Sequence, residues 1–293
     1  MTPAVETPTK SRLPWVQIGW FGALMILCYA PVLQKLVKQW NDDADMSHGF
    51  FVPLVAGFII WQRREELAAI KPQPNWWGLA VVLWGAVQLW LGTLAVELFL
   101  MRTAFIITLI GAVWLLGGDL VLRKVAFPLF LCFFMVPIPA VIYNSITFPL
   151  QLLASHLAEQ ALSILSVPVM REGNVLMLPN QDLQVVEACS GIRSLLSLTF
   201  LALVYGHFFE RRLWIRAVLF AATIPIAIVA NASRVTLTGV LTQVKPELAE
   251  GFFHTASGWV IFMVALVILI FLHQLLTRFS GYLERRRVRA ASE

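Results

Sequence analysis

Charged residues are scarce in this sequence. Asp, Glu, Lys and Arg make up 13% of its 293 residues, whereas soluble domains carry about 25%. Hydrophobic residues make up 59% and are spread along the whole chain. Because each bilayer crossing takes about 20 apolar residues, this composition excludes a soluble globular domain and predicts a polytopic membrane protein. The net charge of +5 then reflects loop residues that set orientation, and we expect no nucleic-acid partner.

Cysteine is also rare, with three in the chain. Cys28 and Cys132 fall inside apolar runs, where cysteine packs as a small hydrophobic side chain. Three scattered cysteines provide no disulfide framework. We expect neither a metal site nor a cofactor. Only Cys189 stands at a boundary, where extended polar sequence turns into an apolar run.

Eight apolar runs predict about eight transmembrane helices. The runs are 15–34, 49–61, 76–92, 101–117, 124–143, 190–209, 214–242 and 255–276. The run 49–61 is short, and a re-entrant segment is the alternative to a full span. Counting it as a span places the basic loop residues on one side of the membrane, as the positive-inside rule requires. We therefore expect both termini in the cytoplasm and the segment 144–189 on the outer side of the membrane.

The long outer segment has two parts. Polar residues recur at helical spacing over 148–165, which predicts a helix lying in the membrane interface. Residues 169–186 predict two or three short strands, with turns at 172–174 and 179–182. The expected fold is an all-α polytopic membrane protein with an outer-face interfacial helix and a short β-hairpin before Cys189. We expect a single domain over 1–293, with a core at 40–275 and a basic tail at 277–293.

Cys189 is the candidate nucleophile. It lies on the predicted outer face at the start of a transmembrane helix, where exposed N–H groups stabilise a thiolate. An unpaired thiol at an oxidising surface is a hazard unless it has a function. The alternative is a packed cysteine at a helix end.

Arg234 is the candidate stabiliser of negative charge. Asn231, Arg234 and Thr238 lie three and four residues apart, so they form one polar stripe on a helix. An arginine at the centre of a span costs roughly 2.5–3.5 kcal/mol and is a functional candidate by default. A snorkelling arginine is the alternative, although snorkelling here would run against the charge rule.

His254 is the candidate general acid or base. It stands at the outer start of the last span, at the same predicted depth as Cys189 and Arg234. His48, also predicted on the outer side, is its rival. A lone interfacial histidine more often only forms a hydrogen bond, so the case for His254 depends on the combination.

Several motifs together resemble the exosortase family of integral-membrane sorting enzymes. They are REGN at 171–174, VEACSGIRS at 186–194, NASR at 231–234, HTASG at 254–258, SHGFFVP at 47–53 and VPIP at 136–139. The resemblance implies a membrane transpeptidase with Cys189, Arg234 and His254 as catalytic residues. It also implies substrates that are exported proteins with a C-terminal sorting signal, made of a Pro-Glu-Pro motif, a transmembrane helix and a basic cluster.

The expected reaction begins with attack of the Cys189 thiolate on a backbone carbonyl of the signal. Arg193 either pairs with the substrate glutamate or forms a structural ion pair with Glu187 or Glu172. We place Asn231, Glu187 and His48 with it as substrate-binding candidates. A hydrolytic cysteine protease is the nearest alternative function, because only the acceptor distinguishes it from a transpeptidase. A transporter or a polysaccharide-assembly protein fits less well, since the polar residues cluster at one face and carboxylates are few.

Overall fold

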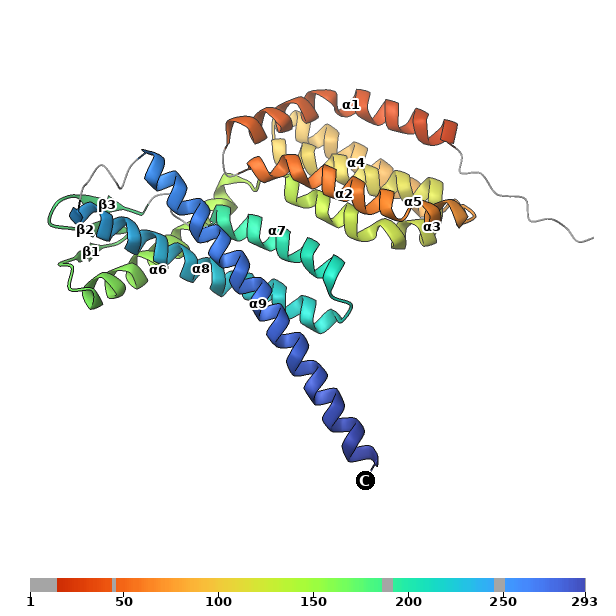
Figure 1. The fold of residues 1–293 in the computed structure, drawn as a ribbon. Coiled ribbons are helices and arrows are strands. Elements are labelled where there is room, and N and C mark those ends of the chain that lie inside the picture. The colour runs from red at the N-terminus through yellow and green to blue at the C-terminus, as the bar shows by residue number, and fades with distance from the viewer. Residues whose placement is uncertain (1–14, 44–45, 186–191, 245–250, 293) are drawn as a thin grey trace, which may run out of the picture. The chain divides into compact units, whose positions relative to one another are not determined.

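The computed structural model describes residues 15–43, 46–185, 192–244 and 251–292. Its elements are helices apart from one small sheet of three strands in the described residues (Figure 1). They form two compact units, Met1–Pro139 and Ala140–Glu293.

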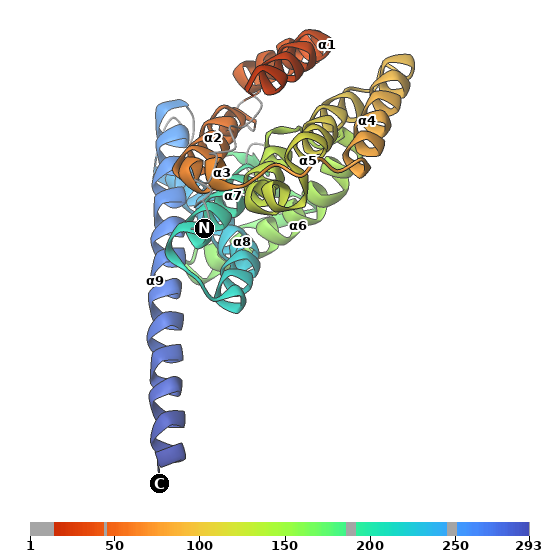
Figure 2. The same ribbon diagram turned by 90° about the vertical axis from the view of Figure 1, so that its right-hand side faces the viewer.

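The first unit consists of helices only within its described residues. Its α-helices are α1 (Trp15–Asp42), α2 (Phe51–Gln62), α3 (Arg64–Ala69), α4 (Trp77–Leu94) and α5 (Leu98–Leu131). Two short 3-10 helices complete it, η1 (Ser47–Phe50) and η2 (Cys132–Met135). Helices α4 and α5 lie side by side along their length (Figure 2).

Small residues bring α4 and α5 together. A Cβ atom at Gly78 or Gly85 of α4 would overlap the backbone or side chains of α5, and Gly111 of α5 is equally close to α4. In a bilayer, helix association depends on such close van der Waals packing, because apolar contact with lipid is equally favourable. The glycines therefore determine where these two helices touch.

Helix α5 is broken at Gly118. This residue has φ 78° and ψ −172°, and a Cβ atom there would overlap the carbonyl oxygen of Gln73. Only glycine adopts such a backbone conformation readily. The break separates the predicted run 101–117 from the run 124–143, so the long α5 contains the first of these runs and the beginning of the second.

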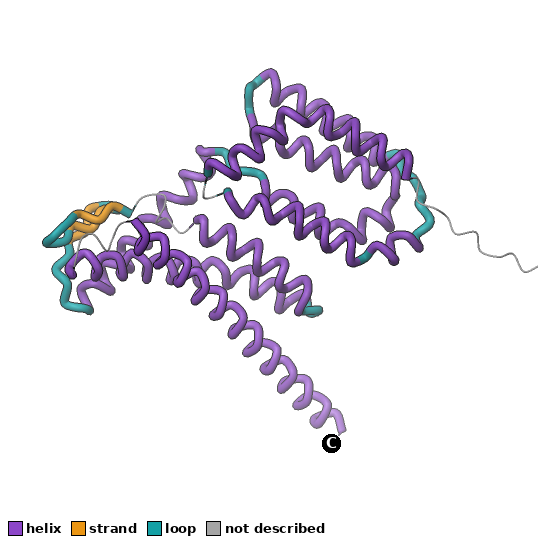
Figure 3. Tube along the Cα trace, turned by 45° about the horizontal axis from the view of Figure 1, so that its top comes forward, coloured by secondary structure: helices purple, strands orange, loops and turns teal. Residues whose placement is uncertain are grey.

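The second unit contains the sheet and the remaining helices. Its elements are α6 (Ala140–Ile164), β1 (Met170–Glu172), β2 (Val175–Met177), β3 (Asp182–Gln184), α7 (Ile192–Phe209), α8 (Leu213–Val244) and α9 (Gly251–Ser292). The strands form an antiparallel meander in the order β1-β2-β3 (Figure 3). Gly173, with φ 62°, makes the first turn. The strands and turns predicted from 169–186 are thus confirmed.

Two apolar clusters hold the second unit together. The first joins the sheet to α6 and α8 and contains Ala158, Leu162, Leu176, Leu178, Val185 and Val235. The second joins α7, α8 and α9 and contains Leu198, Ala202, Ile215, Leu219, Ala265 and Leu269. Because both clusters include residues of α8, this helix is the common support of the sheet and of the three-helix layer.

Five helical stretches in the described residues are long and apolar enough to cross a membrane. They are Gly19–Asp42, Trp77–Leu94, Leu98–Met135, Leu213–Gln243 and Ala256–Arg285, and Ser47–Gln62 and Ser194–Phe209 are shorter apolar helices. Only 17–22% of the most apolar window of each long stretch is buried inside the protein, so most of this surface is available to lipid. Each of the eight predicted apolar runs falls mainly in helix within the described residues, although the run 124–143 includes the non-helical residues 136–139. The prediction of an all-α polytopic membrane protein is confirmed.

The expected helix over 148–165 differs from α6 in two respects. The observed helix α6 begins earlier than expected, at Ala140, directly after the prolines that end the preceding segment. Part of its polar stripe is also buried, since Gln151 is 7% exposed and Ser155 0%. The Ser155 hydroxyl donates to the carbonyl oxygens of Gln151 and Gly173, so this part of the stripe supports the β1–β2 turn.

Candidate active site

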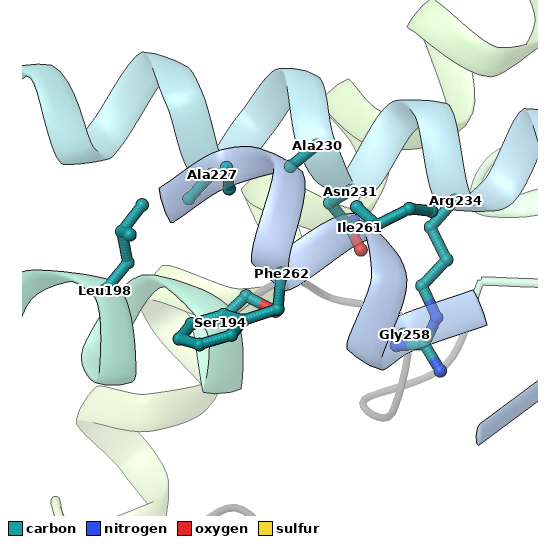
Figure 4. A pocket seen from close by; sticks show the side chains of 10 residues that line it. Ser194, Leu198, Ala227, Ala230, Asn231, Arg234, Gly258, Ile261 and Phe262 are labelled. Atoms are coloured by element: carbon teal, nitrogen blue, oxygen red, sulfur yellow. The ribbon is translucent and has the colours of Figure 1, made fainter. Parts of the chain in front are cut away.

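Three helices of the second unit enclose one pocket. Ser194 of α7, Asn231 and Arg234 of α8, and Gly258 of α9 line it (Figure 4). The rest of its wall is apolar and consists of Leu198, Ala227, Ala230, Ile261, Phe262 and Ala265. Polar side chains from α7 and α8 therefore converge within an otherwise apolar surface that α9 completes, which is the usual composition of a binding site.

Gly258 makes room for the Arg234 side chain. The guanidinium extends from α8 toward α9 (Figure 4), and a Cβ atom at position 258 would lie 3.3 Å from Cζ and 3.4 Å from Nη2. These distances are shorter than ordinary van der Waals contact. The half-buried arginine thus lies beside α9 at a place where a side chain larger than that of glycine would crowd it.

The predicted polar stripe on α8 divides into two parts. Asn231 is 6% exposed and lines the pocket with Arg234. Thr238 is 5% exposed, but its hydroxyl donates to the Arg234 carbonyl oxygen at 3.0 Å, one turn back along the helix. Of the three stripe residues, Asn231 and Arg234 belong to the site and Thr238 supports the helix.

The other predicted residues of this site lie at the edges of the described structure. Cys189 and Glu187 fall outside the described residues, and Cys189 precedes Ser194 of the pocket by five positions. Arg193 and His254 are placed by their backbone alone, as the second residue of α7 and the fourth of α9. Position 254 stands one helical turn before Gly258.

His48 lies in the first unit, in η1. Its Nε2 is 3.1 Å from the carbonyl oxygen of Phe134. A carbonyl can only accept a hydrogen bond, so Nε2 carries a proton in this arrangement. His48 therefore contacts the backbone of η2, in its own unit.

The REGN motif fastens the sheet to α6. The Arg171 guanidinium donates from Nε to Glu159 Oε2 at 2.8 Å, and its Nη1 donates to the Gly173 carbonyl at 3.0 Å. The hydrogen bond from Arg171 lowers the pKa of the Glu159 carboxyl below its ordinary value. Asn174 Nδ2 donates to the Val185 carbonyl at 3.0 Å. The motif thereby fixes the chain just before residues 186–191, which contain Cys189.

A second polar cluster, at the opposite end of the three-helix layer, was not predicted. His273 of α9 contacts Tyr205 Oη through Nδ1 at 2.8 Å and Glu210 Oε2 through Nε2 at 3.2 Å. Burial acts to raise the pKa of Glu210, but hydrogen bonds, including those from Arg212 N and His273, outweigh burial and lower it. Fifteen residues of α9 separate His273 from Gly258, or about 22 Å of helix. The Gly258 end of the pocket therefore lies, along α9, most of the bilayer's hydrocarbon thickness away from this cluster.

A buried arginine of the first unit was also missed. Arg102 of α5 is 4% exposed, and its Nε has no hydrogen-bond partner among the described residues. Glu97 acts on it through charge alone. The signal was present in the sequence, since Arg102 is the one charged residue inside the run 101–117. An arginine of this kind in a span is a functional candidate by default.

The fold and the pocket define a multi-pass membrane protein with a polar site near one end of its helices. A family model described as transmembrane exosortase matches residues 40–271, and the chain belongs to this family. The resemblance seen in the motifs is confirmed. Neither a curated protein nor a solved structure matches the chain. Family membership makes the protein a membrane-bound sorting transpeptidase whose substrates are exported proteins.

Proposed function

We propose that this protein is a cysteine transpeptidase that cleaves the C-terminal sorting signal of exported proteins at the periplasmic face of a bacterial inner membrane. The signal is a Pro-Glu-Pro motif followed by a transmembrane helix and a basic cluster. Cys189 is the nucleophile, His254 moves the proton and Arg234 stabilises the oxyanion. The exported protein, cut free of its signal, is then joined to an acceptor.

One observation carries this proposal. The pocket unites Ser194, Arg234 and Gly258, which come from three different helices. Cys189 lies five positions before Ser194 in the sequence, and His254 lies four positions before Gly258. The three residues proposed for catalysis are therefore either in this pocket or within a few residues of its wall.

The surroundings of Arg234 suit an oxyanion. Its guanidinium is planar, permanently charged and able to donate two parallel hydrogen bonds to oxygen. Gly258 leaves free the space that this guanidinium occupies beside α9. A donor that is already in place stabilises developing charge without reorganisation, and the loss of one such donor costs about 3 kcal/mol in comparable sites.

The chemical steps follow from these roles. The Cys189 thiolate attacks the scissile carbonyl carbon, a C–S bond forms, and the carbonyl oxygen becomes an oxyanion beside Arg234. The C–N bond then breaks, and His254 delivers a proton to the leaving amine, which departs with the transmembrane helix of the signal. An acceptor nucleophile next attacks the thioester, gives its proton to His254 and releases the Cys189 thiolate.

Co-expression with a tagged exported protein that carries the signal tests the proposal. We expect cleavage by the wild type, none by Cys189→Ala, and nearly unchanged cleavage by Cys28→Ala and Cys132→Ala. Mass spectrometry of the new C-terminus distinguishes transfer, which leaves a modified end, from hydrolysis, which leaves a free carboxylate. An uncut substrate, or full activity of Cys189→Ala at equal expression, contradicts the proposal.

A further inference from the structure

The outer edge of β3 carries backbone groups that the sheet does not use. Successive residues of a strand direct their N–H and C=O groups to alternate sides. Val185 N donates to Asn174 O at 2.8 Å, so position 185 faces β2, and Leu183, two residues earlier, faces β2 as well. The N–H and C=O groups of Asp182 and Gln184 therefore point away from the sheet.

No described residue forms a hydrogen bond with this edge. The hydrogen bonds of the described part of the chain do not reach the backbone N–H or C=O groups of Asp182 and Gln184. The side chains of both are exposed, while Leu183 between them packs toward the apolar cluster beneath the sheet. An edge of this kind is a template for a further strand.

The edge of β1 at the other side of the sheet differs. By the same alternation only Arg171 directs its N–H and C=O groups outward there, and its side chain is held by Glu159 and by the Gly173 carbonyl. The β3 edge offers two residues with free backbone groups, so it is the better site for an added strand.

β3 is also held firmly. Asn180 Nδ2 at the β2–β3 turn donates to the Thr242 carbonyl of α8 at 3.3 Å, and Asn174 Nδ2 donates to the Val185 carbonyl at 3.0 Å. Leu176 and Val185 are 0% and 1% exposed. A strand fixed at both ends loses little conformational entropy when a further strand pairs with its edge, which favours binding of an extended chain.

We propose that an extended segment of the polypeptide substrate pairs with β3 as a fourth strand, through the N–H and C=O groups of Asp182 and Gln184. This inference rests on the proposed function and specifies how its substrate is held. Cys189 follows Gln184 by five residues, which is at most about 17 Å of extended chain. A peptide paired with this edge therefore lies within a few residues of the nucleophile.

The proposed signal is suited to this mode of binding. Proline has no N–H, so it is tolerated in an added strand only where its nitrogen points away from the neighbour. In an extended Pro-Glu-Pro segment the backbone groups of both prolines point to one side of the strand, and those of the central glutamate point to the other side. The glutamate N–H and C=O groups then face β3 while both proline nitrogens face outward, whichever direction the peptide runs.

A proline scan of the edge tests the pairing. Gln184→Pro removes an outward N–H group that β2 does not use, whereas Gln184→Ala keeps that group and removes only the side chain. We expect Gln184→Ala to process the tagged substrate at close to the wild-type rate. Gln184→Pro should be slower by about tenfold or more, the effect of one hydrogen bond lost. Equal labelling of Cys189 by a thiol reagent in both variants checks that the site remains folded.

Disulfide trapping reads the pairing directly and does not depend on turnover. In a Cys28→Ala, Cys132→Ala, Cys189→Ala background, cysteine is placed at position 182, 183 or 184, and one cysteine is placed along the signal of the substrate. Side chains of paired strands approach to about 5 Å on the same face. We expect positions 182 and 184 to trap alternate substrate positions, and position 183 to trap the positions between them.

The two failures are distinguishable. If the wild type leaves the substrate uncut, the proposed function fails, and the trapping pattern still reports on the edge. If the wild type cleaves while Gln184→Pro is equally active, or if trapping shows no alternation, the fourth-strand proposal is wrong. Where Gln184→Pro does not accumulate in the membrane, the trapping pattern alone decides.

Discussion

Arg234 occupies its position because residue 258 has no side chain. In Gly258→Ala the new Cβ atom, 3.3 Å from Cζ, would displace the guanidinium by a few tenths of an ångström. Alanine also raises helix propensity by about 1 kcal/mol. We therefore expect Gly258→Ala to accumulate as well as the wild type and to process substrate at least tenfold more slowly, because misplaced oxyanion donors lose most of their effect.

Gly281→Ala is the matched control for this substitution. Gly281 lies on the same helix, and nothing is within 4 Å of a Cβ atom placed there. The Gly281→Ala variant should gain the same helix propensity as Gly258→Ala and keep full activity. Equal processing by the two alanine variants would show that contact between Gly258 and Arg234 has no part in the reaction.

The two rival histidines make different predictions. If His254 moves the proton, His254→Ala should lose about two to four orders of magnitude in processing rate, the usual range for general acid–base catalysis. His48→Ala should lose less, because it removes a hydrogen bond to the Phe134 carbonyl within the first unit. The measurement is the rate of substrate cleavage at matched expression. If His48→Ala is inactive while His254→Ala remains active, His48 rather than His254 moves the proton.

At the scale of elements, the attachment of β1 to α6 should depend on pH. The Arg171 guanidinium lowers the pKa of the Glu159 carboxyl, so the folded state favours the ionised form. The contribution of the Arg171–Glu159 ion pair to stability is then complete above the pKa of about 4.3 that Glu159 has in the unfolded chain. It is lost as pH falls through the lower pKa that Glu159 has in the folded protein. For a partly exposed pair it is about 1 kcal/mol or less.

Thermal unfolding in detergent tests this dependence. Wild type should exceed Glu159→Gln in melting temperature at neutral pH, and the difference should shrink as the solution is made more acidic than pH 4. Glu172→Gln, an exposed position on the same hairpin, should show no such trend. A difference that stays constant down to low pH would exclude the ion pair as its cause.

The elements were predictable where local signals are strong. Apolar runs predicted the helices, and glycine and asparagine at the turns predicted the strands, because both signals depend on neighbouring residues only. The start of α6 was misjudged by eight residues, since the sequence after Pro139 continues the apolar character of the preceding run. Gln151 and Ser155 appeared as part of a solvated stripe because their partners on the hairpin lie far away in sequence.

The candidate site was predictable to a similar degree. Arg234 and Asn231 were identified by the cost of polar groups in a span, and both line the pocket. The steric role of Gly258 was not apparent, because it depends on contact between α8 and α9. The contact of His273 with Glu210 joins residues 63 positions apart, a pairing that no local pattern indicates.

At the scale of the whole molecule, the central prediction is the side of the membrane on which the pocket lies. Within the second unit, the basic residues Arg211 and Arg212 follow the C-terminal end of α7, and Arg212 contacts Glu284 of α9 at 3.2 Å. The Gly258 end of the pocket lies about 22 Å along α9 from His273, away from this basic end. By the positive-inside rule we expect the basic end to be cytoplasmic and the pocket to open on the periplasmic side.

Labelling of single cysteines in intact cells tests this orientation. In the Cys28→Ala, Cys132→Ala, Cys189→Ala background, a reagent that cannot cross the membrane should modify Asn180→Cys and spare Arg212→Cys, and both should react after the membrane is permeabilised. Asn180 contacts the Thr242 carbonyl near the C-terminal end of α8, so its label reports the side of that end. A thiol transpeptidase that processes exported proteins must act on the side to which they are exported. If Asn180→Cys is protected in intact cells, Cys189 lies on the side of the membrane opposite to its exported substrates. This result would contradict the catalytic proposal, whatever the geometry of the pocket.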